Sequence, residues 1–378
     1  MYVIIIPDSF KGTLSSTKVI DRIHAGLRRH FKDLEVTEIP IADGGEGTVH
    51  ALVHALGGTE YTCDVQDPLG RPTVAKYGIC GKKAIIEMAE AAGINKVRPE
   101  ARNLAEASTY GVGEMLLKAL NHDVDEVIVG IGGSATNDGG VGMLQALGAR
   151  FYGESGQRLI GGGKILEHIR SVDTSMIDKR LFDIPIVVMC DVTNPLTGPL
   201  GATYVYGPQK GGDEETLNRL EMGMKNYRKV IMNHVNIDVD MIPGSGASGG
   251  LGAAFVSFLG ATLKPGIDSI LDLVNFDALV ETADLVITGE GKMDEQTVYG
   301  KVPTGVSKRC VGKKAKVIAI VGTEGKDARA TYDYGIDAIV STVTQNMSEE
   351  ELMQTAELRL DRAVDSMCRL LRIGAELK

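Results

Sequence analysis

Residues 3–13 read VIIIPDSFKGT. A run of β-branched residues stops at Pro7 and Asp8, and an amphipathic stretch follows over residues 17–30. A short, continuous apolar run is typical of a strand that is buried on both faces, and the periodic stretch after it indicates a helix. These residues therefore predict a strand, a polar loop and a helix in that order, as in one half of a βαβ unit.

The same alternation recurs along the chain. Further apolar runs lie at residues 36–41, 84–88, 127–130, 184–189, 285–288, 317–321 and 338–343. Amphipathic stretches lie at residues 47–56, 105–120 and 141–147. Near the end, Ser348 and Glu351 have the spacing of a helical capping box, and an apolar stripe at helical spacing follows them. The pattern predicts an α/β fold with parallel sheets.

The strand distribution suggests a discontinuous domain organisation. A chain of 378 residues favours two domains over one. We expect residues 1–65 and 284–378 to form a flavodoxin-like domain whose parallel sheet combines N- and C-terminal segments. Residues 66–283 would form a second α/β domain inserted into the first, and the active site would lie in the cleft between the two domains.

Composition narrows the function classes. The net charge of −10 offers no footprint for nucleic acid or for an anionic membrane surface. The five cysteines contain no C-x-x-C pair, which argues against a disulfide framework or a zinc site. The first apolar run lacks a basic n-region and is too short for a signal peptide or a membrane span, so we expect a cytoplasmic protein.

The first two loops place polar residues after strands, where α/β sheets usually bind ligands. The first loop carries Asp8, Ser9 and Lys11, and the second, residues 40–48, carries Asp43 and Glu46. Structural roles remain open, because Lys11 could be a solvated residue of a helix-entry turn. Likewise, Asp43 could form a turn and Glu46 could stabilise a first helical turn.

The third loop, residues 130–142, reads GIGGSATNDGGVG. Gly130, Gly132 and Ala135 fit the dinucleotide-binding pattern, and Glu154 lies near the expected ribose-binding acid. However, the polar run TND and further glycines precede any helix. Such a loop suits polyphosphate oxygens held by backbone N–H groups. A nicotinamide-dependent oxidoreductase and a phosphoryl-transfer enzyme are therefore both open at this point.

Two further loops carry acids and lysines. Residues 190–196 read CDVTNPL, and Asp191 could bind Mg²⁺, accept a proton from a substrate hydroxyl, or only start a turn. Residues 288–297 read TGEGKMDEQT and bring Glu290, Lys292 and Asp294 to the end of an apolar strand. A second glycine-rich loop, residues 244–252, reads GSGASGGLG and opens a helix.

Taken in order, five of these strings resemble type I glycerate kinases. They are PDSFKG at 7–12, ADGGEG at 42–47, GGSATNDGG at 132–140, CDVTNPL at 190–196 and TGEG at 288–291. The resemblance runs from residue 2 to the C-terminal helix. It implies phosphorylation of D-glycerate, usually on the 2-hydroxyl, with ATP and Mg²⁺, in a cleft between a flavodoxin-like domain and an inserted α/β domain.

Residue roles follow as hypotheses from the chemistry of phosphoryl transfer, which needs positive charge, N–H-rich loops and a placed base. The expected nucleotide-binding residues are Gly132, Gly133, Ser134, Asn137, Asp138, Gly246, Ser248 and Gly249. The expected substrate-binding residues are Asp8, Ser9, Lys11, Asp43 and Glu46. The expected catalytic residues are Lys11, Asp191, Lys292 and Asp294, and the expected Mg²⁺ ligands are Asp43, Asp191 and Glu290.

Two other functions remain open from the residues. One is the nicotinamide-dependent oxidoreductase of a small hydroxy acid, and the other is a non-catalytic sensor that binds an organic acid. The expected partners are D-glycerate and a nucleotide, with no nucleic acid and no membrane. The sequence leaves the oligomeric state open, a homo-oligomer included.

Overall fold

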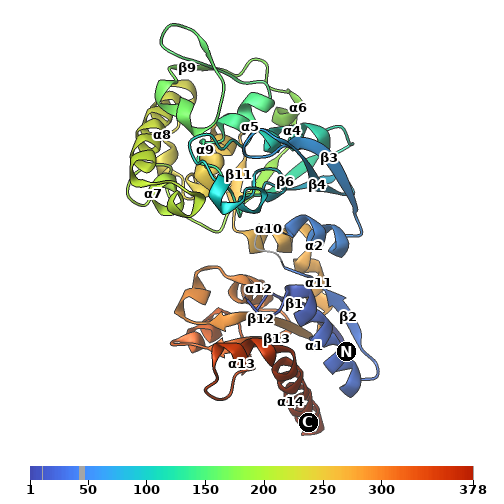
Figure 1. Cartoon of the computed structure of the whole chain (residues 1–378). Helices are drawn as coiled ribbons and strands as arrows, with labels where there is room; N and C mark the ends of the chain where they lie inside the picture. The colour runs from blue at the N-terminus through green and yellow to red at the C-terminus, as the bar shows by residue number, and fades with distance from the viewer. Residues whose placement is uncertain (11, 42–46, 378) are drawn as a thin grey trace. The chain divides into compact units, whose positions relative to one another are not determined.

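The computed structural model describes residues 1–10, 12–41 and 47–377 (Figure 1). The chain divides into two compact units, which are Met1–Ala42 with Ile267–Lys378, and Asp43–Gly266. The domain boundaries expected from the strand distribution are at 65/66 and 283/284. The observed boundaries lie earlier because α2 (Thr48–Ala55) contacts β4 and β5 of the second unit, whereas α11 (Phe276–Thr282) contacts β1 of the first.

The first unit contains a parallel sheet built from both ends of the chain. Within the described residues its order is β14-β13-β12-β1-β2, and every neighbouring pair is parallel. The strands are β1 (Tyr2–Pro7), β2 (Glu35–Glu38), β12 (Leu285–Met293), β13 (Lys316–Glu324) and β14 (Ala338–Ser341). Numbered along the sheet's own strands, this order is 2-1-3-4-5, the flavodoxin-like arrangement. The predicted fold class is confirmed.

Helices cover both faces of this sheet. Val3 and Ile5 of β1 belong to a core cluster with α1 (Ser16–His30) and α14 (Ala356–Glu376), two helices that contact each other (Figure 1). Because side chains alternate along a strand, Ile4 and Ile6 face the opposite side, where α11 and α12 (Val302–Cys310) contact β1. Burial on both faces explains the continuous apolar run that opens the chain.

The C-terminal segment confirms the capping box but not an unbroken helix. The Ser348 hydroxyl accepts from the Glu351 N–H, and the Glu351 carboxylate accepts from the Ser348 N–H. This helix is α13 (Glu349–Gln354), and Thr355 is its C-cap. The next helix, α14, begins at Ala356. Leu360, the first strongly buried residue of the expected stripe, therefore belongs to the second helix.

The second unit is built on a mixed sheet. Its six-stranded order in the described part of the chain is β11-β10-β6-β5-β4-β3. The strands are β3 (Thr59–Gln66), β4 (Pro72–Cys80), β5 (Lys83–Glu87), β6 (Glu126–Gly130), β10 (Ile186–Met189) and β11 (Thr262–Lys264). The β3–β4 and β4–β5 pairs are antiparallel and the others are parallel. Antiparallel β7 (Arg150–Tyr152), β8 (Arg158–Leu159) and β9 (Ser171–Asp173) form a separate small sheet.

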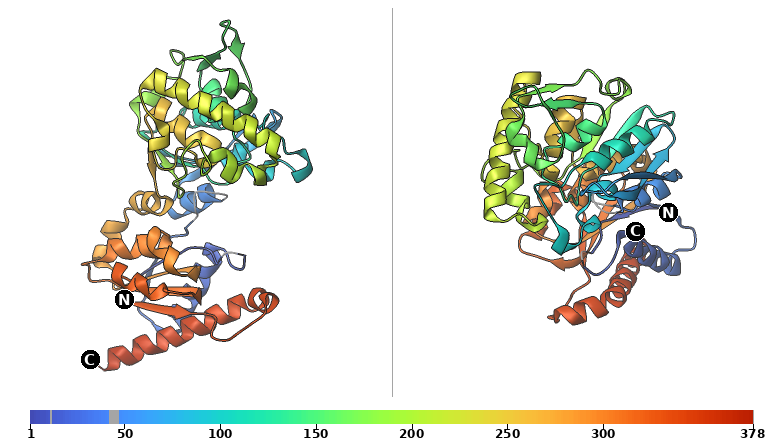
Figure 2. Two further views of the ribbon diagram at one scale, coloured as in Figure 1. Left: turned by 90° about the vertical axis from the view of Figure 1, so that its left-hand side faces the viewer. Right: turned by 45° about the horizontal axis from the view of Figure 1, so that its top comes forward.

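Helices surround the mixed sheet, and the longest of them was absent from the sequence-based expectation. This helix is α8 (Glu214–Val235), the long yellow-green helix of Figure 2. It contacts η3 (Gly163–His168). The others in the described part of this unit are α2, α3 (Ala89–Ala92), α4 (Tyr110–Ala119), α5 (Val141–Ala146), α6 (Arg180–Asp183), α7 (Ala202–Tyr206) and α9 (Ala247–Leu259), while α10 (Gly266–Leu273) follows β11. Among the described residues, none of the helices is long and apolar enough to cross a membrane.

Candidate active site

The first group of candidate residues lies where the order of the flavodoxin-like sheet reverses. Pro7 of β1 is in register with Gly289 of β12, and the Asp8 N–H donates to the Gly289 carbonyl at 2.8 Å. The Asp8 carboxylate in turn accepts from the Ser9 N–H at 2.6 Å. Ligands of open α/β sheets bind beyond the carboxyl ends of the strands at such a reversal. The structure thus brings Asp8 and Ser9, at the carboxyl end of β1, beside the middle of β12.

Beyond Gly289, β12 carries an interlocked set of charged residues. Glu290 is only 5% exposed, and its carboxylate accepts from the Thr297 hydroxyl at 2.6 Å. The Lys301 ammonium lies 3.6 Å from Glu290 and 3.8 Å from Asp294. Lys292, on the exposed side, lies 3.2 Å from Asp294. The three sequence-predicted residues of this loop are therefore neighbours, and Thr297 and Lys301 join them.

The environment of Glu290 is unfavourable to its own negative charge. Burial raises the pKa of Glu290, and the nearby charge of Asp8 raises it further, although the Thr297 hydrogen bond and Lys301 oppose the shift. Such a carboxylate fits a divalent cation, because a cation would neutralise the pair of acids. Among the described residues, no three His, Cys, Asp or Glu side chains form a ready-made metal cage. Mg²⁺ commonly uses one or two carboxylates together with phosphate oxygens and water.

Three of the predicted residues lie outside the described part of the chain. They are Lys11, Asp43 and Glu46. The loop that carries the last two leads into α2, and Gly47 and Val49 at its far end donate backbone N–H groups to Glu87 at 3.0–3.3 Å. Glu87 is 1% exposed and ends β5. It is a buried acid at a strand end that sequence reasoning did not select.

The second group of candidate residues surrounds a cavity of about 390 Å³ in the second unit. The cavity lies at the carboxyl ends of β6 and β10. Its polar lining includes Ser134, Asp191, Tyr206 and Lys210. Its other lining residues are Ile94, Ile131, Gly132, Gly133, Met189, Cys190, Val192, Gln209, Ala247 and Ser248. A pocket of this size and mixed lining is typical of a small-molecule or cofactor site.

The two glycine-rich loops meet at this cavity. The Gly139 N–H donates to the Gly249 carbonyl at 2.8 Å, and the Ser248 hydroxyl donates to the Ile131 carbonyl. Gly249 has φ of +69°, and a Cβ added there would lie 2.1 Å from the Thr136 carbonyl oxygen. Ser248 also adopts a positive φ of 54°, which is uncommon for a residue with a side chain. Glycine at position 249 is therefore required by close backbone approach.

Asn137 and Asp138 hold the first glycine loop from inside. Asp138 is fully buried and accepts from the Thr109 N–H and hydroxyl and from the Gly140 and Gly142 N–H groups at 2.8–3.1 Å. Burial raises the pKa of Asp138, and these hydrogen bonds oppose the shift. Asn137 donates to the Thr203 hydroxyl at 3.1 Å. Neither residue is among those that line the cavity.

Lys210 is the principal cation of the cavity and was not selected from the sequence. Its ammonium is buried and donates to the Ser134 hydroxyl at 2.6 Å and to the Thr136 carbonyl at 2.7 Å. Burial lowers the pKa of Lys210 to about 7, although the negative charge of Asp138 opposes the shift. The glycines on both sides of residues 208–210 were the available signal, but they do not distinguish a buried lysine from a solvated turn.

Asp191 lines the same cavity from the end of β10. Its Oδ1 accepts from the Gly266 N–H at 2.7 Å, at the first residue of α10. Asp191 is an exposed residue and is among those that line the cavity. Gly246, expected in the nucleotide site, donates its N–H to the Asn194 carbonyl at 2.9 Å, which joins the second glycine loop to the loop of Asp191.

Comparison with known proteins gives a consistent family assignment. The model of the Glycerate kinase family matches residues 3–372. A glycerate kinase of Halalkalibacterium halodurans is 44% identical over 363 residues, or 96% of each chain. The glycerate 2-kinase of Escherichia coli K12 is 42% identical over 376 residues, or 99% of each chain.

A solved structure agrees with these relatives. The crystal structure of a protein named as glycerate kinase 2 from Salmonella typhimurium LT2 superposes with a TM-score of 0.88 at 41% identity. The match covers 100% of this chain and 99% of the other. The similarity therefore extends over both units, with the α/β architecture kept throughout.

Proposed function

This chain belongs to the glycerate kinase family, and from that membership we propose that it transfers the γ-phosphoryl group of ATP to the 2-hydroxyl of D-glycerate. The products would be 2-phospho-D-glycerate and ADP. The chain is an enzyme that phosphorylates glycerate, as its relatives' names state for them. The position of the hydroxyl follows the glycerate 2-kinase of Escherichia coli.

The observation that carries the nucleotide assignment is the meeting of two glycine-rich loops beside a buried lysine. Backbone N–H groups of such loops can approach phosphate oxygens closely, and the Lys210 ammonium supplies positive charge next to Ser134. Gly132, Gly133 and Ser248 line the same cavity. In this proposal Asn137, Asp138 and Gly249 act indirectly, because they fix the two loops that hold the phosphates.

The carboxyl end of β1 and the adjoining second half of β12 suit the acceptor and Mg²⁺. Asp8, Ser9 and Glu290 gather there, and Lys292 offers a cation for the glycerate carboxylate or the γ-phosphate. Glu290, with Asp8 beside it, would hold Mg²⁺ together with phosphate oxygens. When bound, Mg²⁺ would supply charge neutralisation of the phosphates. Lys11, Asp43 and Glu46 keep the substrate and metal roles proposed from the sequence.

Two acids are suited to act on the attacking hydroxyl. Asp191 presents a carboxylate to the cavity while Gly266 holds its Oδ1, and Asp294 lies between Lys292 and Lys301. Asp191 lines the cavity that would hold the phosphates, whereas Asp294 is ion-paired with two lysines, so we assign the base role to Asp191 and an orienting role to Asp294.

The relatives give no support to an oxidoreductase or a sensor. Ala135, the third position of the dinucleotide-binding pattern, lies within the loop, because α5 begins only at Val141. The third position of that pattern should lie where helix and strand pack closely. We propose the cytoplasm, which supplies ATP, as the compartment of the enzyme.

The test is ADP release by the purified protein from ATP, Mg²⁺ and D-glycerate, with identification of the phosphoglycerate isomer. Formation of 2-phosphoglycerate is the expected result. Formation of 3-phosphoglycerate would keep the kinase and overturn the position. Absence of glycerate-dependent ADP release would overturn the substrate.

A further inference from the structure

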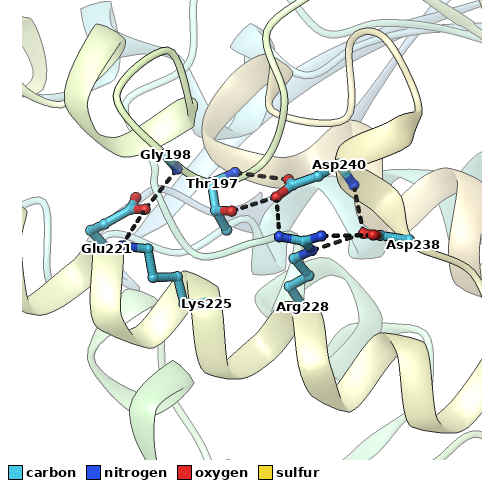
Figure 3. A network of polar contacts seen from close by, with 7 residues as sticks. All are labelled: Thr197, Gly198, Glu221, Lys225, Arg228, Asp238 and Asp240. Carbon is cyan, nitrogen blue, oxygen red and sulfur yellow. Dashed lines mark hydrogen bonds and ion pairs between the residues drawn. The ribbon is translucent and has the colours of Figure 1, made fainter.

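A network of polar contacts (Figure 3) joins α8 to Thr197 and Gly198, just after the loop of Asp191, and its side chains range from buried to partly exposed. None of them is among the residues that line the cavity. The cations of the network, Lys225 and Arg228, and its acid Glu221 all come from α8. Residues 221, 225 and 228 are four and then three positions apart, so they project from one face of the helix. Three polar side chains of the longest helix in the second unit therefore point in a common direction.

This helical face holds the far end of the loop. The Glu221 Oε1 accepts from the Gly198 N–H at 2.7 Å and lies 3.5 Å from the Lys225 ammonium. Glu221 is 1% exposed, and its Oε2 has no hydrogen-bond partner in the described part of the chain. A buried carboxylate that accepts from the Gly198 N–H fixes the position of that residue against α8.

A second anchor comes from Asp240. It accepts from the Thr197 N–H at 3.0 Å and from the Thr197 hydroxyl at 2.5 Å. Arg228 lies 2.7 Å from Asp240 and makes two hydrogen bonds, at 2.8 and 2.6 Å, to Asp238 (Figure 3). Arg228 therefore orients the Asp240 carboxylate. Asp240 in turn holds Thr197 by accepting two hydrogen bonds, one from its N–H and one from its hydroxyl.

The anchored loop reaches the cavity by direct contacts. The Asn194 carbonyl accepts from the Gly246 N–H, and the Asn194 side-chain oxygen accepts from the hydroxyl of Tyr206, a cavity residue, at 2.7 Å. A Cβ added at Gly246 would lie 2.0 Å from the Pro195 carbonyl oxygen, so the two loops are in close backbone contact. Displacement of residues 194–198 would therefore move the second glycine loop and the loop of Asp191 together.

We propose that Thr197, Asp240 and Glu221 are positioning residues, which α8 uses to hold the acid-bearing loop and the glycine loop at the spacing needed to bind nucleotide. This inference rests on the proposed nucleotide role of the cavity. The residues do not touch the nucleotide. Their loss should weaken nucleotide binding and lower turnover together, because both loops would shift.

The experiment uses the full chain and four variants. Thr197→Val removes only the hydroxyl and keeps the shape and the N–H donor, and Thr197→Ser restores the hydroxyl. Asp240→Asn places an amide N–H₂ opposite Arg228. The matched control is Arg219→Gln, because Arg219 also lies on α8 and pairs with Glu167 at 2.5 Å but does not contact the loop. Calorimetry with ADP and Mg²⁺ gives Kd, 2-phosphoglycerate formation gives kcat, and urea unfolding reports stability.

A hydrogen bond to a charged group contributes on the order of a factor of ten, so we expect Thr197→Val to raise the Kd for ADP about tenfold and to lower kcat. Asp240→Asn should act in the same direction, and Thr197→Ser should return both values toward those of the wild type. Arg219→Gln should leave Kd and kcat unchanged. Folded Thr197→Val protein with wild-type Kd and kcat would overturn the inference, and so would equal weakening by Arg219→Gln.

The same experiment tests the proposed reaction independently of the positioning role. Formation of 2-phosphoglycerate by the wild-type protein decides the reaction, whereas the variant Kd values decide the positioning role. A wild-type protein that binds ADP but leaves glycerate unchanged would contradict the proposed reaction and leave the positioning test intact. If Asp240→Asn does not fold, the isosteric Thr197→Val and its serine counterpart still provide the test.

Discussion

The ammonium of Lys210 lies 2.6 Å from the hydroxyl of Ser134, within a cavity framed by two glycine-rich loops. A lysine in this position can exchange its proton near neutral pH, because burial lowers its pKa to about 7. The charge available for a nucleotide phosphate therefore depends on pH. The consequences are opposite for binding and for folding.

For binding, we expect the Kd for ADP with Mg²⁺ to increase as the pH rises above about 7, since Lys210 loses its charge. Lys210→Met should bind ADP at least about tenfold more weakly at pH 6.5, the usual loss for a charge-assisted contact, and should lack this pH dependence. Calorimetry from pH 6 to 9 measures both effects. An identical pH profile for the two proteins would exclude Lys210 from the nucleotide site.

For folding, the sign is reversed. The pKa of Lys210 is lowered in the folded state, so between about 7 and 10.5 the unfolded chain binds the extra proton. The contribution of Lys210 to the free energy of unfolding should therefore rise with pH across that window, by up to about 1.4 kcal/mol per pH unit. Urea unfolding of the wild-type and Lys210→Met proteins should show a difference that changes with pH in this direction. A constant difference would contradict the shift.

Asp191→Asn should lower kcat by about 10²- to 10⁴-fold with little change in KM, as expected for loss of a general base. The fold should survive, because the asparagine side-chain oxygen can still accept from the Gly266 N–H. Steady-state kinetics with D-glycerate measure the effect. Unchanged turnover would remove Asp191 from the mechanism and transfer its role to Asp294.

Glu290→Gln should make the protein more stable at neutral pH and less active. Burial raises the pKa of Glu290, so the folded state holds a proton at pH values where the unfolded chain has lost it. Stability from this group therefore falls as pH rises above the unfolded value of 4.5, and glutamine removes the loss. The Thr297 hydroxyl can still donate to the amide oxygen.

The activity of Glu290→Gln should require at least about tenfold more Mg²⁺ for half-maximal turnover, if Glu290 holds the ion. Glu295→Gln, at a neighbouring exposed acid, is the control and should change neither property. Thermal unfolding and Mg²⁺ titration of turnover provide the measurements. A variant with lower Tm at pH 7 and unchanged Mg²⁺ dependence would contradict both parts.

Gly249→Ala should destabilise the second unit more than Gly57→Ala does. Both glycines have positive φ, +69° and +62°, so the backbone strain is similar. A Cβ at Gly249 would meet the Thr136 carbonyl oxygen, whereas Gly57 has no atom within 4 Å of the added carbon. Overpacking should add about 1–3 kcal/mol for Gly249→Ala, measurable by urea unfolding. Equal losses would show that the two loops can separate at little cost.

The sequence predicted the buried strands well and the half-exposed strands poorly. Each predicted apolar run overlaps a strand, although the run at 36–41 extends three residues past β2, which is only partly buried. The fully buried strands are predicted best, because strands covered on both faces need apolar residues throughout. β3 was missed because it alternates exposed and buried residues near an edge of the sheet. α8 was missed although Asp213 caps it and its buried apolar residues recur every three or four positions, since many charged and polar residues lie between them.

The sequence identified the loops that form the candidate site more successfully than it identified the individual side chains. Glycines and acids at strand ends identify the loops, because the topology fixes where strands end. Local sequence cannot show that Asp138 turns inward to four donors, or that Lys210 is buried beneath the glycine loop. Both outcomes depend on segments distant in the sequence, such as Thr109 for Asp138 and Ser134 for Lys210.

The sheet of the first unit also sets an order for biosynthesis. β1 pairs with β12, and Ile6 and Thr288, which share a hydrogen bond across that pair, are 282 positions apart. At typical rates of about 5–20 residues per second, a ribosome needs roughly 14–56 s to deliver the partner strand. During that interval the edge of β1 that later pairs with β12 has no partner strand. The second unit, which is synthesised before β12, can fold first. Truncated chains that end before Leu285 would keep this edge permanently and should be aggregation-prone and degraded in the cell.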